Sequence, residues 1–501
     1  MLIGPLGKKS AGSALARAGV IALCAALMPS PGSARPAPAQ ESAPQSPEAA
    51  VTTLKDQNDL AVTVYNSNIA LIRDVRKLDL PAGAFQLKFE DIAATVNPAT
   101  VHFRSLTDPS KLGVTEQNYE YDLLEPTKLL HKYVGRELTV VRTHYDNGAF
   151  RQEDIKATLL ADNNGQVWKI GNDIVTGQYA QVYRFPEVPP NLYVRPTLVM
   201  SLKNAGARQQ QVEASYLATN LSWNADYVLT VGRDDKTADL DGWVTLTNNS
   251  GTGFRNARLQ LVAGELNRLP ATGRNVITVE AAAMAVEKEP QFAQENFSEY
   301  HLYTLGRRTS IEDKETKQIS LLEGSGVPLQ KLYVVDGQNF YYHNAQTPGA
   351  PQKDAVKVLY KFKNGEKSGL GIPLPAGNLR VYQQDSKGGI LFVGEDRIGH
   401  TPKDEDVTVH IGNAFDVVCE RLQTDYKHID THTWEMEFEI TLRNHKDAPI
   451  VVQVNEPIGG EWEMLSSTYK YTKTAAWAAQ FSVPVEANGT SVLRYRVRVK
   501  W

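Results

Sequence analysis

The chain has 501 residues, of which 42% are hydrophobic, and it carries 53 basic against 57 acidic side chains. The resulting net charge of −4 excludes a dedicated nucleic-acid-binding protein, because such proteins present a strongly basic face to phosphates. A chain of this length exceeds what one hydrophobic core usually supports, so we expect two to four domains.

The first 39 residues have the order of a secretory signal peptide. Lysine and arginine residues precede the apolar run AGVIALCAALM (18–28), and small residues follow it around GSA and APA. This order predicts cleavage after Ala34 or Ala39 and export of the mature chain. The apolar run has 11 residues, whereas a membrane-spanning helix needs roughly 20. No second run of that length follows, so the sequence predicts no transmembrane helix.

The two cysteines differ in their setting. Cys24 follows Leu23, where a lipid-anchoring signal requires Gly, Ala or Ser, so we expect no lipid anchor. Cleavage after Ala39 leaves 49 basic against 57 acidic residues, a net charge of −8, and Cys419 as the single cysteine. One cysteine cannot form an internal disulfide, and the apolar stretch AFDVVCERL predicts that Cys419 is a buried, unreactive strand residue.

The segments before residue 195 predict a linker and two small β domains. Residues 40–57 are rich in Pro, Ala, Ser and Gln without an apolar period, which indicates a flexible linker. Residues 58–118 contain short alternating runs between turn residues and predict an N-terminal β-sheet domain. Residues 120–190 begin with a short helix in EPTKLLHKYVG (125–135), bounded by proline and glycine. The short strands that follow, with tight Asn-Gly turns, predict a small bent β-barrel.

The remainder of the chain predicts antiparallel β-sandwiches. Alternating runs of strand length, with turn signals and no intervening helices, occupy residues 195–270 and 301–501. Residues 271–300 break this pattern with Ala, Glu and Gln and predict a linker or exposed loop. The expected fold class is mainly β, with several antiparallel β-sandwich domains and a small bent β-barrel that carries one short helix.

Two segments near the C-terminus alternate strictly between apolar and charged residues. WEMEFEITL (434–442) carries glutamates on one face, and LRYRVRVKW (493–501) carries arginines and a lysine on one face. We expect the two strands to lie in one sheet with the glutamate and arginine rows adjacent, which would fix their register. The second strand also resembles the closing strand of an outer-membrane β-barrel, a less favoured alternative because such barrels need many regular strands.

The sequence contains none of the standard motifs of metalloproteases, serine hydrolases, nucleotide-binding loops or paired-cysteine zinc sites. HIDTH offers His428, Asp430 and His432 on one face of an extended strand, as a zinc site would need. These residues also fit an exposed polar start of the following strand, and we favour that reading because no further ligand lies nearby.

Two other groups of residues have a functional and a structural reading. Asp239, Asp241 and Gly242 could belong to a calcium loop, but the remaining spaced ligands are missing, so a turn is favoured. In NFYYHN (339–344), Phe340 and Tyr342 would share a face and could stack on a sugar ring. Half-buried tyrosines are ordinary in sheets, and the structural reading is again favoured.

The stretch TNLSWNADYVL (219–229) places polar residues inside an apparent strand. Trp223, Asn224 and Asp226 could form an exposed ligand site. We favour a structural role, in which Trp223 anchors the core while Asn224 and Asp226 bond to backbone at the entry of the strand.

Several blocks resemble a known bacterial family. TNLSWNADYVLTV, DLDGWVTLTNNSGTGFRNARLQLVAGELNR, EYHLYTLGRRTSIEDKETKQISLL and RNHKDAPIVVQVNEPIGGEWEML are similar, in order, to the domain-of-unknown-function 4139 family, which includes mucoidy-inhibitor-A-like exported proteins. The resemblance covers about residues 195–501, and residues 62–92 resemble the N-terminal domain that often precedes it. Some relatives carry a long coiled coil between these parts, but residues 120–190 are β-rich here, so its role is not transferred.

The resemblance implies an exported, mostly β protein of the bacterial envelope, in the periplasm or outside the cell. It supplies no activity, cofactor, metal or catalytic residue. We therefore predict a non-catalytic protein that binds or scaffolds an envelope protein or glycan. The alternative is a secreted hydrolase whose acid, base or metal ligands come from separate strands.

Overall fold

The computed structural model describes residues 49–120, 123–146, 148–163, 165–176, 182–189, 192–264, 291–347 and 349–501. All of these belong to one of two compact units, residues 48–501. The predicted signal peptide, Cys24 and residues 40–48 of the predicted linker lie outside the described residues. Residues 50–57 of that linker are not flexible coil, because they form β1 (Ala50–Thr52), a 3-10 helix (Leu54–Asp56) and the first residue of β2. Thirty-two strands and a single α-helix make up the described regular structure together with four short 3-10 helices, which confirms a mainly β fold. No helix in the described ranges is long and apolar enough to cross a membrane.

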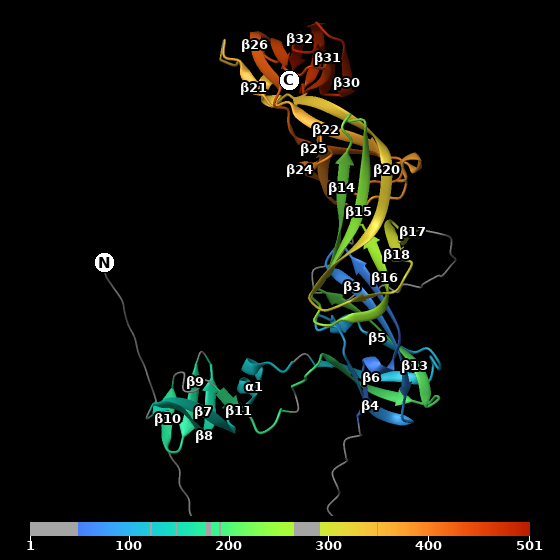
Figure 1. The fold of residues 1–501 in the computed structure, drawn as a ribbon, viewed down its shortest axis with the longest axis vertical. Helices are drawn as coiled ribbons and strands as arrows, with labels where there is room; N and C mark the ends of the chain where they lie inside the picture. Colours follow the sequence, from blue (N-terminus) through green and yellow to red (C-terminus); the bar gives the residue numbers. More distant parts are fainter. Residues whose placement is uncertain are drawn as a thin grey trace, which may run out of the picture. The chain divides into compact units, whose positions relative to one another are not determined.

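Two sheets contain most of the strands from the first half of the chain (Figure 1). The four-stranded sheet has the order β1 (Ala50–Thr52), β4 (Gly83–Glu90), β12 (Thr197–Asn204), β6 (Leu112–Glu120). The eight-stranded sheet has the order β17 (Phe292–Phe297), β18 (Tyr300–Leu305), β16 (Phe254–Ala263), β2 (Gln57–Tyr65), β3 (Ile69–Asp79), β13 (Gln209–Thr219), β5 (His102–Ser105), with β19 (Thr309–Ile311) on β16. Strands from residues 57–79 therefore pair directly with strands that lie far later in the sequence. Residues 292–297, expected in a linker or loop, form β17; residues 271–290 lie outside the described residues.

Two further sheets are built from the rest of the family-like region. The ten-stranded sheet has the order β24 (Ile390–Ile398), β23 (Gly377–Gln384), β14 (Leu221–Val231), β15 (Thr237–Asn248), β20 (Glu315–Asp336), β28 (Ile450–Glu456), β31 (Ala478–Val485), β30 (Tyr471–Ala475), with β22 (Lys357–Lys363) and β25 (Asp406–Asn413) attached through β20. The five-stranded sheet has the order β21 (Gln352–Asp354), β26 (Val417–Asp430), β27 (Thr433–Asn444), β32 (Thr490–Lys500), β29 (Glu461–Ser467).

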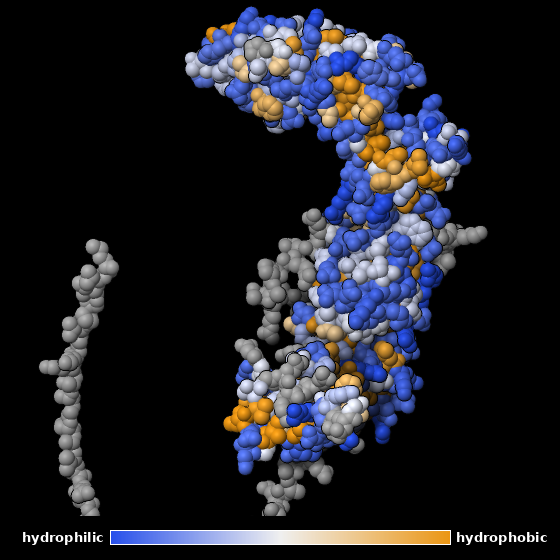
Figure 2. Space-filling model, turned by 60° about the vertical axis from the view of Figure 1, so that its left-hand side comes forward, coloured by the Kyte–Doolittle hydropathy of each residue, from blue (hydrophilic) through white to orange (hydrophobic). Residues whose placement is uncertain are grey.

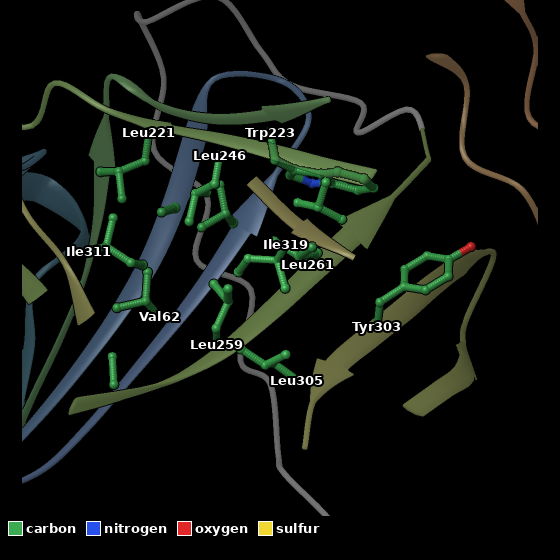
Figure 3. Packing of buried hydrophobic residues seen from close by; sticks show 14 of the residues in the cluster. Val62, Leu221, Trp223, Leu246, Leu259, Leu261, Tyr303, Leu305, Ile311 and Ile319 are labelled. Atoms are coloured by element: carbon green, nitrogen blue, oxygen red, sulfur yellow. The ribbon is translucent and has the colours of Figure 1, made fainter. Parts of the chain in front are cut away.

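The larger hydrophobic core joins the inner faces of the eight-stranded sheet and the first part of the ten-stranded sheet. Strand β14 alternates strictly, with Leu221, Trp223 and Tyr227 buried. The indole Nε1 of Trp223 donates a hydrogen bond to the Val262 carbonyl at 3.3 Å, and Tyr303 meets its ring edge to face (Figure 3). The surface seen in Figure 2 is mainly hydrophilic with separate apolar patches, as expected when apolar side chains face inward.

A short helix and a small sheet form a third core. Helix α1 (Pro126–Lys132) confirms the predicted helix, and Pro126 takes the first position, where a missing N–H costs nothing. The sheet has the order β10 (Asp173–Thr176), β9 (Gln166–Ile170), β8 (Ala149–Asp162), β7 (Glu137–Asp146), β11 (Val182–Arg184). Within the described ranges its end strands do not pair, so the expected closed barrel was wrong. Leu130 and Tyr133 pack with Trp168, which covers the apolar face without closure.

The charged ladder near the C-terminus has the predicted arrangement. Strands β27 and β32 are antiparallel neighbours, and each of three glutamates lies opposite an arginine. The ion pairs are Glu435 with Arg498 at 2.8 Å, Glu437 with Arg496 at 2.6 Å, and Glu439 with Arg494 at 2.6 Å. The prediction of one sheet with adjacent rows is confirmed, and a shift of one residue would lose all three pairs.

Candidate functional site

Strand β14 separates the residues of TNLSWNADYVL onto two faces. Trp223 is 1% exposed and points into the core, so its predicted role as a core anchor is confirmed. Asn224 and Asp226 lie on the opposite face of the same strand. The prediction that both residues bond to backbone at the entry of the strand was wrong. Asn224 is exposed in the middle of the strand, and Asp226 forms hydrogen bonds with side chains.

The outer face of β14 and β15 carries an exposed tryptophan. Trp243 lies directly opposite Asp226 on β14 and Ser320 on β20, and it is 38% exposed. Its strand buries Val244 and Leu246 on the other face. A tryptophan on the solvent side of an alternating strand exposes apolar surface that the fold does not use.

Hydrogen-bonding side chains surround this ring. The carboxylate of Asp226 accepts a hydrogen bond from the Thr245 hydroxyl at 2.7 Å and from Nη1 of Arg380 at 3.2 Å. The Gln318 amide donates to Thr245 at 3.2 Å, and Asn224 lies opposite Thr245. We name this set the Trp243 face: Asn224, Asp226, Trp243, Thr245, Gln318 and Arg380.

The Trp243 face combines two chemical properties. An exposed indole ring can cover the C–H groups of a flat ligand, such as a sugar ring. The neighbouring carboxylate, hydroxyl, amide and guanidinium groups can accept from or donate to hydroxyl groups at the ligand edge. Trp243 was not among the candidate residues identified from the sequence. Its position in DLDGWVTLT is out of phase with Leu240, Val244 and Leu246, which could have indicated that it lies on the outer face.

The residues considered for zinc are all exposed. His428 and Asp430 are at the end of β26, and His432 follows in the turn. The His428 ring stacks on Trp434, and Asp430 accepts a hydrogen bond from the backbone N–H of His432 at 2.9 Å. Over the described ranges, no group of three His, Cys, Asp or Glu side chains is placed to hold a metal ion.

The residues considered for calcium lie in strand β15 and not in a turn. Asp239 accepts from the Gly326 backbone N–H at 2.9 Å, and Asp241 lies opposite Glu323. Partial burial, then Glu323 and Asp239, raise the pKa of Asp241. Gly242 is buried, and a Cβ there would lie 2.9 Å from Cγ of Leu322, so this glycine allows close packing.

The aromatic segment 339–344 does not form the sugar-stacking platform that was considered as the less favoured alternative. Phe340 is 56% exposed, but Tyr341 and Tyr342 are buried in a 3-10 helix (Asn339–Tyr342). His343 stacks on the ring of Trp501. Phe340 and Tyr342 therefore do not share an exposed face, because Phe340 is exposed and Tyr342 is buried.

Tyr342 belongs to a buried charged network in the second core. Arg421 donates to Asp354 at 2.8 Å and to Glu456 at 2.7 Å, and Arg421 and Glu456 are both fully buried. Tyr342 donates to Glu456 and lies 2.8 Å from the hydroxyl of Tyr495. Burial, and then the charge of Glu456, raise the pKa of both tyrosines well above the usual range. The network pairs Arg421 with two carboxylates and links β26 to β28, although Nη1 of Arg421 is buried without a hydrogen-bond partner.

Cys419 gives a direct test of core burial. It is 1% exposed on β26, and burial raises the pKa of its thiol to about 12. Because the thiolate is the reactive form, we expect a chain starting at residue 40 to resist an aromatic disulfide reagent at about pH 8 while folded. One thiol per chain should react after unfolding in urea. Equal labelling rates in the folded and unfolded protein would contradict the burial.

Comparison with known proteins identifies the family of this chain. A model for a domain of unknown function, number 4139, matches residues 212–501, which is more than half of the chain. No curated protein matches the sequence. The matched range contains β14 and β15 and so includes the whole Trp243 face. The chain therefore belongs to the domain-of-unknown-function 4139 family, as the sequence blocks predicted.

Proposed function

We propose that this protein is a non-catalytic, exported binding protein of the bacterial cell envelope that holds a glycan on its Trp243 face. The observation that carries the proposal is an exposed tryptophan whose neighbours on three strands are hydrogen-bonding side chains. The basic, apolar and small-residue order of the first 39 residues supports export.

The bonding of Asp226 supports binding over catalysis. Its carboxylate is held by Thr245 and Arg380, and its side chain is 17% exposed. A carboxylate fixed by two donors is a good acceptor for a ligand hydroxyl, whereas an acid or base in a hydrolase must exchange a proton with substrate. The flat sheet face also suits a ligand that lies along the surface.

The test is retention on purified peptidoglycan and envelope polysaccharide. We expect Trp243→Ala to weaken retention about tenfold or more, because a central aromatic residue usually supplies a large part of the binding free energy. Trp477→Ala is the matched control, since Trp477 is also exposed, at 64%, but lies between β30 and β31. The control should bind like the unmodified protein.

Three results would contradict the proposal. If the unmodified protein retained neither glycan, a glycan would not be its ligand. If Trp243→Ala bound as well as the unmodified protein, the Trp243 face would not be the binding site. Release of soluble sugar fragments on incubation would contradict the non-catalytic part and favour the hydrolase.

A further inference from the structure

Four arginines share two carboxylates on the outer face of the eight-stranded sheet. Asp59 is paired with Arg73 and Arg258, each at 3.3 Å, and with Arg308. Glu213 is paired with Arg73 at 2.6 Å and with Arg104 at 3.0 Å. We name this set the arginine face: Asp59, Arg73, Arg104, Glu213, Arg258 and Arg308.

The arginine face carries more positive than negative charge. Four guanidinium groups against two carboxylates give a net charge of +2, on a chain whose total is −4. The ladder of β27 and β32 is different, because each of its three glutamates lies opposite one arginine. Arg496 and Arg498 of that ladder also pair with Asp425 and Glu463. The arginine face has more guanidinium groups than carboxylates, which leaves positive charge available to a further anion.

The guanidinium groups remain accessible. The arginine side chains are 37% to 52% exposed, whereas Asp59 is 21% and Glu213 is 4% exposed. Partial burial alone would raise the pKa of Asp59, but Arg308, Arg258 and Arg73 together lower it, so this carboxylate stays ionised. The carboxylates thus lie beneath the arginines and hold them in place.

A small residue separates two of the arginines. Ala61 on β2 lies opposite Arg73 on β3 and opposite Arg258 on β16, so the three side chains share one face. The two arginines are separated by two strand spacings, or about 10 Å at the backbone. Ala61 is 9% exposed and has no atoms beyond its methyl group to separate the two guanidinium groups, and Asp59 also holds Arg308.

We propose that the arginine face is a binding site for a tetrahedral oxyanion, a phosphate group carried by an envelope polymer or lipid headgroup. A phosphate presents oxygens in several directions, so it can accept from Arg73, Arg258 and Arg308 on their exposed side while Asp59 holds the same three arginines. The site is on a different sheet from the Trp243 face and does not depend on the proposed glycan binding.

The test uses two phosphate probes. Calorimetric titration with inorganic tripolyphosphate should show binding that weakens with added salt, and sedimentation with phosphatidylglycerol vesicles tests the lipid source. Arg258→Gln should weaken binding about tenfold or more, as expected for loss of a charge-assisted contact. Ala61→Glu should abolish it while all four arginines remain. Its thermal midpoint is measured alongside, and Arg258→Gln remains the test if Ala61→Glu does not fold, because Ala61 is buried.

Arg494→Gln is the control for general charge loss, because Arg494 is a 60% exposed arginine on the balanced ladder. It should bind both probes like the unmodified protein. Arginine-dependent binding to tripolyphosphate supports a phosphate group carried by a polymer, and arginine-dependent binding to the vesicles alone supports a lipid headgroup. Binding to neither probe, or equal binding by Arg258→Gln and Ala61→Glu, would overturn the proposal.

Discussion

Replacing Arg421 with methionine is expected to lower the free energy of unfolding by about 3–5 kcal/mol, as measured by urea unfolding. Arg421 and Glu456 are both fully buried, and the guanidinium group also bonds Asp354 and lies over the ring of Tyr341. Removal of the arginine leaves the Glu456 charge buried without its cationic partner. That uncompensated charge, more than the lost attraction, accounts for the expected effect.

The double variant Arg421→Met with Glu456→Gln separates these two causes. If the orphaned charge dominates, neutralising Glu456 should recover part of the stability lost by Arg421→Met. This account would be contradicted if the free energy of unfolding of Arg421→Met lay within about 1 kcal/mol of that of the unmodified protein. It would also be contradicted if the double variant were less stable than the single variant.

Trp223→Ala is expected to cost about 3–5 kcal/mol of unfolding free energy, because a fully buried tryptophan leaves a large cavity. The matched control is Trp243→Ala in the adjacent strand, where a side chain that is 38% exposed leaves no enclosed cavity and should cost clearly less, about 1–2 kcal/mol. Urea unfolding followed by circular dichroism measures both. Similar losses for the two variants would contradict the assignment of Trp223 to the core and Trp243 to the surface.

Periodicity in the sequence predicted the local features of the fold well. The strict alternation of residues 434–442 and 493–501 predicted both the buried faces and the charged ladder, because side chains in a strand alternate with a period of two. The helix at Pro126 followed from its terminal residues. In the same way, Trp243 could have been identified from its phase.

Long-range pairing could not be predicted from such local patterns. Strand β2 pairs in parallel with β16, and the arginine face combines residues from β2, β3, β5, β13 and β16 with Arg308 before β19. Each arginine alone is an ordinary polar residue of its strand. Likewise, the hydrogen bond from Tyr342 to Glu456 joins residues that are far apart in the sequence, so it could not be predicted.

The pairing of β2 with β16 makes the family domain depend on strands outside the matched region. The matched region begins at residue 212, inside β13, yet β13 and β16 pair with β3 and β2, which precede that boundary. A fragment that contained only the matched region would lack the two central strands of its own sheet and leave the backbone N–H and C=O groups of β13 and β16 unpaired. In this protein the matched region is therefore not a free-standing module, because strands that precede it complete its sheet.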